Sequence, residues 1–518
     1  MEFLQKIEEM SKKYGTRTAF HSNFGSISYE ELWQQSGRIA QALEEELGDD
    51  KHPVVVYGHK RPEMLVGFLA CVRSGRAYCP VDVNMPADRI ATIVSMTECP
   101  VMLATEPADD MPARVLDIDW MQGVAKDESR AIIDPAKRAV AKDVLYIIFT
   151  SGSSGTPKGV QITQDNVNGY LNWFRKLTVT ADGNSEAGIY LNQAPYSFDL
   201  SVMDLYNALT TGSTIWSVDK ELQSEIPTLL EYLKEGNITH WVSTPSFADV
   251  CLSDKRFCGE EYSTIVKFLF CGETLGRNTA AQLLERFPKA EVYNTYGPTE
   301  ATVCVSWVEI TNEVLQQGGP LPVGRAGEGL EIRIEPGDNP DMQEGHGEIV
   351  LCGRTVSPGY FKDVEKTEKV FADVNTDDAI LEGTNAAKGR MRTYRTGDEG
   401  FLDENNMLHY VGRLDQQIKL DGYRIELGDI ESNLMKLDGV SSAAVVPVYK
   451  GEKIRHLAAF VVMEDNDREW GYSDRRNIRQ GLQETLPDYM VPRKVSFVAH
   501  LPMTNNGKVD KKKLEGMV

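Results

Sequence analysis

Short apolar runs alternate with amphipathic stretches between residues 53 and 104, and this alternation constrains the fold more than any other feature of the chain. Residues 53–57, 77–81 and 101–104 are short and apolar, which predicts buried strands. Residues 62–73 and 87–97 show helical periodicity and predict helices. Because strands that alternate with helices form parallel sheets covered on both faces, we expect an α/β fold with doubly wound, mixed or parallel sheets.

An earlier helix is predicted from about residue 29 to the acidic residues 44–46. Ser28 and Glu31 have the spacing of a capping box, in which each side chain binds the other residue's backbone N–H. Apolar residues then recur at helical spacing at Leu32, Ile39 and Leu43. This helix therefore begins before the first predicted parallel strand.

The chain of 518 residues exceeds what one hydrophobic core supports, so at least two domains are expected. From about residue 328 to 411, short β-type runs separated by glycines predict a small antiparallel β subdomain, with a surface loop at the polar residues 373–390. A small α+β module follows, so we predict an N-terminal domain over residues 1–414 and a C-terminal domain over residues 415–518. The elements predicted from residue 328 onward are strands at 330–334, 347–352, 400–402, 408–411, 416–420, 442–448 and 457–463, and helices at 426–436 and 475–486.

Charge limits the partners of this chain. A formal net charge of −22 would repel nucleic acids and anionic membranes, so we expect neither as a partner. The first residues lack a secretory signal and no apolar run reaches membrane-spanning length, which predicts a cytoplasmic protein without membrane insertion. The eight cysteines form no C-x-x-C pair, which argues against a zinc site or a disulfide framework.

Residues 150–159, Thr-Ser-Gly-Ser-Ser-Gly-Thr-Pro-Lys-Gly, follow the apolar residues 144–149 and have the composition of a phosphate-binding loop. Glycines let backbone N–H groups face a common centre, while hydroxyls and one lysine add donors and positive charge. The loop is not a Walker A motif, because Lys158 is followed by glycine instead of Ser or Thr. A flexible turn between two elements is the alternative interpretation.

Four further segments follow the loop in the chain. They are Asn294-Thr-Tyr-Gly-Pro-Thr-Glu300, Tyr394-Arg-Thr-Gly-Asp398, Gly412-Arg-Leu-Asp415 with Asp421-Gly-Tyr-Arg-Ile-Glu426, and Asn505-Asn-Gly-Lys508. In this order the five segments resemble the adenylate-forming superfamily, which includes acyl-CoA synthetases, luciferases and adenylation domains of nonribosomal peptide synthetases. The resemblance covers nearly the whole chain and implies a ligase that uses ATP and Mg²⁺ to activate a carboxylate, with release of pyrophosphate.

The resemblance also implies a nucleotide site. Tyr296 would stack on adenine, Asn294 would bind its amino edge, and Asp398 would accept both ribose hydroxyls. Taken alone, Tyr-Gly-Pro and Thr-Gly-Asp are also typical of ordinary turns. The other ATP-binding residues implied are Thr150, Ser151, Lys158, Gly272, Glu273, Thr295, Gly297, Pro298, Thr299, Tyr410, Arg413 and Lys508.

Three residues have catalytic roles by the same resemblance. Thr299 would contact the α-phosphate and Glu300 would bind Mg²⁺, which prefers oxygen ligands. Lys508 would bridge the substrate carboxylate and the α-phosphate, although its basic surroundings are also typical of a solvated tail. Asp415 would be the hinge about which a mobile C-terminal domain rotates between two reaction steps.

Asp199 matches the position at which amino-acid-activating members hold the substrate ammonium. A partly buried carboxylate suits an ammonium group and disfavours a plain fatty acid. In the alternative interpretation Asp199 only caps the following helix. The other substrate-binding residues implied are Met203, Leu269, Cys271, Val303 and Lys508, with Leu200 and Cys304 also in the pocket wall; Cys271 could equally be an ordinary buried cysteine.

Segments 198–206, 270–273 and 294–303 are most similar to the members that activate D-alanine. This similarity implies D-alanine as substrate and a phosphopantetheinylated D-alanyl carrier protein as the acceptor in trans, for D-alanylation of lipoteichoic acid in Gram-positive cell walls, by a monomeric enzyme. An alternative is a stand-alone adenylation enzyme of the peptide-synthetase type for another small amino acid. A nucleotide-binding regulator without catalysis is a third possibility, which the joint presence of Glu300, Asp398 and Lys508 disfavours.

Overall fold

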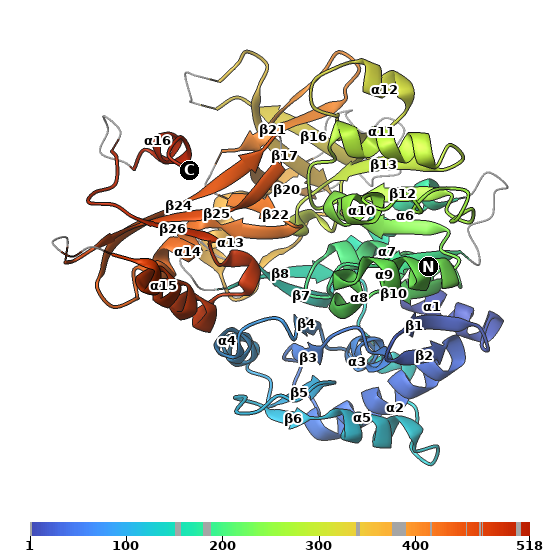
Figure 1. The fold of residues 1–518 in the computed structure, drawn as a ribbon. Coiled ribbons are helices and arrows are strands. Elements are labelled where there is room, and N and C mark those ends of the chain that lie inside the picture. The colour runs from blue at the N-terminus through green and yellow to red at the C-terminus, as the bar shows by residue number, and fades with distance from the viewer. Residues whose placement is uncertain are drawn as a thin grey trace. The chain divides into compact units, whose positions relative to one another are not determined.

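The predicted alternation of strands and helices is present in the structure, a computed structural model that describes residues 3–150, 157–179, 188–337, 342–375, 390–414, 417–451, 453–465, 468, 470–503 and 509–518 (Figure 1). Helices α3 (Pro62–Arg73) and α4 (Ala87–Thr97) and strand β5 (Val101–Ala104) have the predicted bounds. Strands β3 (Val54–Gly58) and β4 (Tyr78–Asp82) each lie one residue further along the chain than predicted. Helix α2 (Tyr29–Leu47) begins with the predicted capping box, in which Ser28 and Glu31 bind each other's backbone N–H.

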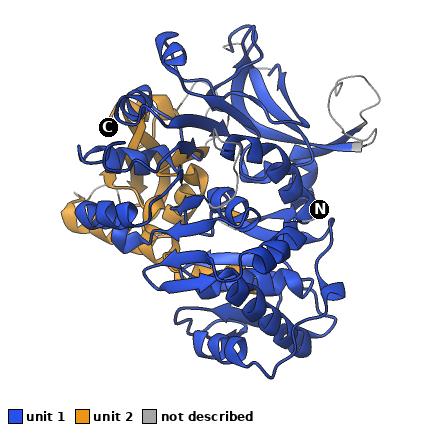
Figure 2. Cartoon of the chain, turned by 90° about the vertical axis from the view of Figure 1, so that its right-hand side faces the viewer, with its two compact units in different colours: residues 1–82, 97–148, 159–414 blue, residues 83–96, 149–158, 415–518 orange. Residues whose placement is uncertain are grey.

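The chain divides into two compact units, which Figure 2 shows in blue and orange. The first unit comprises residues 1–82, 97–148 and 159–414, and the second comprises residues 83–96, 149–158 and 415–518. Asp415, where we predicted the domain boundary and hinge, lies outside the described residues, so the boundary stays a prediction.

A seven-stranded sheet of the first unit contains the predicted parallel strands. Its order is β18-β8-β7-β4-β3-β5-β6, and β3 pairs in parallel with both β4 and β5. All five residues of β3 and of β4 are buried, as expected for strands covered on both faces. The remaining strands of this sheet are β6 (Arg114–Leu116), β7 (Val144–Thr150), β8 (Lys158–Thr163) and β18 (Gly359–Tyr360).

A nine-stranded mixed sheet forms the larger layer of the first unit, in the order β15-β14-β13-β12-β11-β9-β10-β1-β2. Apolar side chains of its parallel strands alternate between two cores: Val242 and Leu269 join one cluster, whereas Trp241, Phe268 and Phe270 join the other. The strands are β1 (Thr18–Ser22), β2 (Gly25–Ser28), β9 (Ile189–Asn192), β10 (Thr214–Ser217), β11 (His240–Ser243), β12 (Lys267–Phe270), β13 (Glu291–Tyr296), β14 (Ser306–Glu309) and β15 (Arg325–Ala326). Both faces are therefore covered, which confirms the doubly wound α/β architecture.

Helices and short 3₁₀ turns connect these strands. The helices are α1 (Phe3–Lys13), α5 (Ile118–Lys126), α6 (Gln164–Thr178), α7 (Leu200–Leu209), α8 (Lys220–Ser224), α9 (Ile226–Glu235), α10 (Pro245–Leu252), α11 (Arg277–Arg286), α12 (Asn312–Gln316) and α13 (Val364–Val370). The 3₁₀ turns are η1 (Pro135–Lys137) and η2 (Thr299–Ala301).

The predicted antiparallel β subdomain is present as a five-stranded sheet of β16 (Leu330–Glu335), β17 (Gly347–Gly353), β20 (Arg390–Leu402), β19 (Phe371–Asn375) and β21 (Leu408–Arg413). The prediction of a loop over residues 373–390 was wrong for Asp373–Asn375 and for Arg390, because Asp373–Asn375 form the end of β19 and pair with β20, which begins at Arg390. Strand β20 is also longer than the predicted 400–402. Residues 376–389 of the predicted loop lie outside the described residues.

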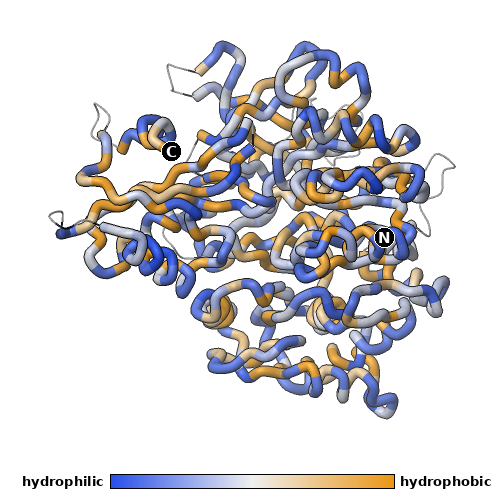
Figure 3. The backbone as a smooth tube through the Cα atoms, viewed as in Figure 1, coloured by the Kyte–Doolittle hydropathy of each residue, from blue (hydrophilic) through white to orange (hydrophobic). Residues whose placement is uncertain are grey.

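The second unit contains the predicted small α+β module. Strands β24 (Val440–Lys450), β25 (Lys453–Met463) and β26 (Lys494–Phe497) form one sheet, and β22 (Gln417–Leu420) pairs with β23 (Tyr423–Glu426). Figure 3 shows β24 and β25 as largely hydrophobic and α15 (Tyr472–Thr485) as largely hydrophilic, which matches a sheet that is buried beneath amphipathic helices. The other elements are α14 (Leu427–Leu434), η3 (Asp488–Met490) and α16 (Lys511–Glu515).

Candidate active site

The segment Asn294–Glu300 leaves the carboxyl end of strand β13, where ligands bind in open α/β sheets. The turn after the strand requires glycine at position 297, because a Cβ there would lie 2.4 Å from the Cα of Cys304 and 2.9 Å from the carbonyl oxygen of Val303. Asn294 donates from Nδ2 to the carbonyl oxygen of Pro322 at 2.8 Å, and Thr295 donates to that of Phe270 at 2.7 Å. These bonds hold the segment against its neighbours.

Four predicted nucleotide-binding residues, Tyr296, Asp398, Tyr410 and Arg413, are linked by contacts centred on the Asp398 carboxylate. The hydroxyl of Tyr296 donates to Oδ2 of Asp398, and Arg413 Nη1 donates to Oδ1 at 2.8 Å. Arg413 also donates to the carbonyl oxygen of Thr396 at 2.8 Å, and the rings of Tyr296 and Tyr410 lie 5.9 Å apart. Burial, and secondarily the nearby Asp398 carboxylate, raise the pKa of Tyr296 well above its usual value, so the phenol stays a donor.

The carboxylate of Glu300 is fully buried in the short turn η2. The hydroxyl of Tyr360 donates to its Oε1 at 2.9 Å, and the backbone N–H of Ser357 donates to its carbonyl oxygen at 2.9 Å. Among the described residues no group of three or more His, Cys, Asp and Glu side chains could hold a metal ion. A cation at Glu300 would therefore be coordinated by this carboxylate together with phosphate oxygens of the substrate, as Mg²⁺ commonly is.

Two predicted site residues of the phosphate-loop segment, Thr150 and Lys158, are described and lie within the second unit. Thr150 Oγ1 donates to the carbonyl oxygen of Lys158 at 3.5 Å. The ammonium of Lys158 lies 3.2 Å from Oε1 of Glu426, and both side chains are buried. The predicted site residues Ser151, Asp415 and Lys508 lie outside the described residues.

Asp199 occupies the position before helix α7, but its side chain makes no hydrogen bond to the first turn of that helix. The alternative that Asp199 only caps α7 is therefore wrong. One turn further along α7, Met203 is completely buried.

The other predicted pocket residues share one apolar cluster with Met203: Leu200, Leu269, Cys271, Val303 and Cys304. The thiol of Cys271 donates to the carbonyl oxygen of Val303 at 3.6 Å. Burial and the neighbouring Cys271 raise the pKa of Cys304 well above its usual value, so this thiol stays neutral and the wall stays apolar.

Backbone strain marks the segment that joins the nucleotide motif to this pocket. Thr302 and Val303 have φ values of 59° and 70°, a left-handed conformation that β-branched residues rarely adopt. Such strain is stored where the surrounding structure holds a functional segment in place. Nearby, Gly272 has a φ of 92°, which glycine adopts without strain, and Glu273 Oε2 accepts from the backbone N–H of Ser246 at 3.1 Å.

Tyr360 is a site residue that no sequence motif predicted. Its hydroxyl contacts a carboxylate 60 residues away, and no local pattern reports such a distant contact. The only nearby signal is the turn-forming pair Pro358 and Gly359, which predicts a break in the chain and nothing about the tyrosine hydroxyl.

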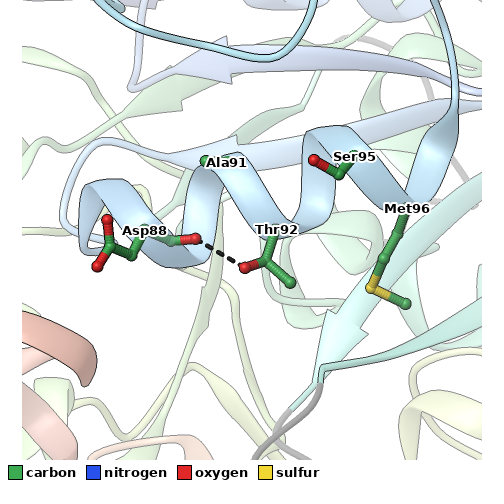
Figure 4. Close-up of a pocket in the computed structure, with 5 residues that line it drawn as sticks. All are labelled: Asp88, Ala91, Thr92, Ser95 and Met96. Carbon is green, nitrogen blue, oxygen red and sulfur yellow. Dashed lines mark hydrogen bonds between the residues drawn. The ribbon is translucent and has the colours of Figure 1, made fainter.

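A separate hollow lies along helix α4 and is lined by Asp88, Ala91, Thr92, Ser95 and Met96 (Figure 4). All five residues come from this one helix, and the hydroxyl of Thr92 donates to the carbonyl oxygen of Asp88 at 2.8 Å. None of them is a predicted site residue, so we assign this hollow no part in the site.

Within the described residues no helix is long and apolar enough to cross a bilayer.

Comparison with known proteins places these motifs in a family context. Residues 7–361 match the AMP-binding enzyme family, and residues 429–508 match the AMP-binding enzyme C-terminal domain. The chain is 42% identical over 517 residues to the D-alanine–D-alanyl carrier protein ligase of Bacillus licheniformis, with 99% of each chain covered. It is 41% identical over 518 residues to the ligase of the same name from Bacillus cereus, again with 99% of each chain covered.

Solved structures show a similar fold at lower identity. A double mutant of the o-succinylbenzoate CoA synthetase of Bacillus subtilis aligns with a TM-score of 0.81 and 19% identity, covering 99% of this chain and 98% of that one. A Vibrio cholerae adenylation domain in complex with glycyl-adenosine-5'-phosphate aligns with a TM-score of 0.78 and 20% identity, covering 100% and 97%. These likenesses confirm the adenylate-forming fold.

Proposed function

Because the chain belongs to the AMP-binding enzyme family, we propose that it is the ligase that activates D-alanine for a carrier protein. In the first step a carboxylate oxygen of D-alanine attacks the α-phosphorus of ATP, the bond to pyrophosphate breaks, and D-alanyl-AMP forms. In the second step the phosphopantetheine thiol of a D-alanyl carrier protein attacks the acyl carbon, loses its proton, and displaces AMP. The product is a thioester.

The observation that carries this proposal is the 42% identity over 99% of both chains to a ligase named for these substrates. The site is consistent with it. The side chain of Asp199 does not cap helix α7, and its carboxylate contributes, after burial and Cys271, to the raised pKa of Cys304 in the apolar pocket wall. A carboxylate in such surroundings favours a substrate that carries an ammonium group. Cys271 and Val303, which are in contact, belong to this wall.

In this proposal the residues around Asp398 bind the nucleoside. Tyr296 stacks on adenine, Asn294 binds its amino edge, and Asp398 accepts the ribose hydroxyls after exchanging its bonds with Tyr296 and Arg413. A carboxylate that already accepts two donors can accept two ribose hydroxyls at the same oxygens. The other nucleotide contacts come from Gly272, Glu273, Thr295, Gly297, Pro298, Thr299 and Tyr410.

Charge neutralisation comes from the remaining residues. Thr150, Ser151 and Lys158 bind the phosphates that leave as pyrophosphate, and Glu300 holds Mg²⁺, which neutralises phosphate charge when bound. Lys508 bridges the carboxylate of D-alanine and the α-phosphate. Rotation of the C-terminal domain about Asp415 then withdraws Lys508 before the thiol attacks.

We place this reaction in the cytoplasm and propose that a monomer carries it out, supplying D-alanyl groups for lipoteichoic acid. ATP–pyrophosphate exchange with D-alanine, L-alanine, glycine and D-serine tests the first step, and thioester formation on a phosphopantetheinylated D-alanyl carrier protein tests the second. We expect the highest exchange rate with D-alanine. A clear preference for another amino acid would show that the chain is a different stand-alone adenylation enzyme, and ATP binding without exchange would refute catalysis altogether.

A further inference from the structure

Tyr360 makes a buried hydrogen bond to a carboxylate for which the proposed reaction needs a fixed orientation. The distance between Tyr360 Oη and Glu300 Oε1 is 2.9 Å, and the exposed fractions of the two residues are 7% and 0%. A hydrogen bond to an ionised acceptor is roughly twice as strong as one between neutral groups, and burial protects it from competition by water. The hydroxyl can therefore hold the Glu300 side chain in one rotamer.

The position of Tyr360 is itself fixed by its backbone. Strand β18 pairs antiparallel with β8, with Gly359 opposite Gln161 and Tyr360 opposite Val160. The next N–H, that of Phe361, donates to the carbonyl oxygen of Gly159 at 2.7 Å. Tyr360 is thus attached to strand β8, whose first two residues, Lys158 and Gly159, are the last two of the phosphate-loop segment.

Two further contacts restrain Tyr360. Its backbone N–H donates to Oγ1 of Thr367 at 2.9 Å. Its ring packs edge-on against Phe371, with the ring centroids 5.4 Å apart and an interplanar angle of 73°. The hydroxyl therefore has little freedom to leave the Glu300 carboxylate.

The same short segment also holds the backbone around Glu300. Ser357 N–H donates to the carbonyl oxygen of Glu300 at 2.9 Å, and the hydroxyl of Thr302 donates to the carbonyl oxygen of Thr355 at 2.6 Å. Residues 355–360 consequently restrain both the main chain of turn η2 and the carboxylate that projects from it. This segment joins the turn to strand β8.

We propose that Tyr360 is a positioning residue for the metal-binding carboxylate of Glu300, an inference that rests on the function proposed above. In this role Tyr360 acts through Glu300 and not on ATP or the amino acid directly. Its hydroxyl orients Glu300 toward a divalent cation, and strand pairing connects Tyr360 to strand β8, which begins at the end of the phosphate-loop segment. Outer hydrogen-bond partners of this kind typically change metal affinity by about 10–100-fold when they are removed.

The test is Tyr360→Phe, which removes the hydroxyl and keeps the ring. Binding of Mn²⁺ to the full-length enzyme with a non-hydrolysable ATP analogue, followed by electron paramagnetic resonance, measures metal affinity without turnover. We expect Mn²⁺ binding to weaken by about 10–100-fold. The Mg²⁺ concentration for half-maximal ATP–pyrophosphate exchange should rise in parallel, with the rate largely recovered at saturating Mg²⁺.

Tyr262→Phe is the matched control. Tyr262 is also buried, its hydroxyl donates to the carbonyl oxygen of Leu230 at 2.9 Å, and neither residue is a predicted site residue. Loss of a hydroxyl that has only a structural role should lower the unfolding temperature and leave the Mn²⁺ affinity unchanged. Equal Mn²⁺ affinity in the two variants overturns the proposal. If Tyr360→Phe does not fold, Thr367→Val loosens the backbone of Tyr360 without removing the hydroxyl, and unchanged Mn²⁺ affinity there overturns it as well.

Glu300→Gln separates this inference from the function on which it rests. If Glu300→Gln keeps the wild-type Mn²⁺ affinity, the assignment of the metal to Glu300 is wrong and the inference about Tyr360 is overturned with it. If Glu300→Gln loses affinity and Tyr360→Phe does not, only the inference fails. When Glu300 binds the metal and Tyr360 acts through Glu300, adding Tyr360→Phe to Glu300→Gln causes no further loss of Mn²⁺ binding.

Discussion

Gly297→Ala should damage the amino-acid pocket far more than it damages the fold. The added Cβ would lie 2.4 Å from the Cα of Cys304, 2.9 Å from the carbonyl oxygen of Val303 and 3.0 Å from the carbonyl carbon of Cys304. Carbon atoms in contact are about 3.5–4.0 Å apart, so this backbone must move by about 1 Å. Overpacking of this size lowers the free energy of unfolding by about 1–3 kcal/mol.

The functional effect should be larger because the displaced residues are the proposed pocket wall. Val303 and Cys304 lie in the same apolar cluster as Cys271, so a shift of their backbone changes the shape of the pocket that receives the amino acid. A misplacement of about 1 Å can cost about 100-fold in rate. We therefore expect kcat/KM for D-alanine in the exchange assay to fall about 100-fold, while the unfolding transition stays cooperative.

Gly123→Ala is the control of opposite sign. Gly123 lies inside helix α5, and a Cβ there meets no atom within 4 Å. Alanine should raise the free energy of unfolding by about 0.5–1 kcal/mol and leave exchange activity unchanged. Exchange activity and stability of Gly297→Ala similar to those of Gly123→Ala would refute a steric clash at position 297.

Three further predictions concern single charges. Asp199→Asn should raise KM for D-alanine by about 30-fold, equivalent to about 2 kcal/mol for a lost charge pair, with ATP binding unchanged by calorimetry; an unaltered KM contradicts the ammonium-binding role. Glu426→Gln should release the ammonium of Lys158, which lies 3.2 Å from Glu426, and lower KM for ATP by about fivefold, equivalent to about 1 kcal/mol. The control Glu431→Gln, which removes the partner of Lys511, should not change KM for ATP. Burial lowers the pKa of His240 from 6.5 to about 4, so between about pH 6.5 and 4 only the unfolded chain gains this proton. The free energy of unfolding should therefore fall by about 3 kcal/mol as the pH is lowered across that window. Chemical denaturation of His240→Gln should show a correspondingly weaker pH dependence.

The sequence predicted those elements whose signals are local. Ser28 and Glu31 form a capping box within one turn of α2, and Pro62 occupies the first turn of α3, where its missing N–H costs nothing. Apolar periodicity then gave the bounds of α3 and α4 correctly. These features need only interactions between residues a few positions apart, so they can be read without knowledge of the fold.

Local signals were insufficient where a partner strand decides the structure. Asp373–Asn375 are polar and resemble a loop, yet they form the end of β19 because Asp373 pairs opposite Arg392 of strand β20. Strand β20 likewise runs from Arg390 to Leu402, although only its last residues, 400–402, have a clear β pattern. Backbone hydrogen bonds to a neighbouring strand stabilise such segments, and residue type alone does not report them.

By its own residues the sequence determined the α/β class, the order of the motifs and the chemical groups available for an adenylating site. Only the tertiary structure decided which of these groups meet: Tyr296 with Asp398, 102 residues away, and Glu300 with Tyr360, 60 residues away. Strand order and register set such contacts, and both depend on packing of the whole unit. A sequence motif therefore identifies the side chains available for the site, whereas the residues that they contact depend on long-range packing.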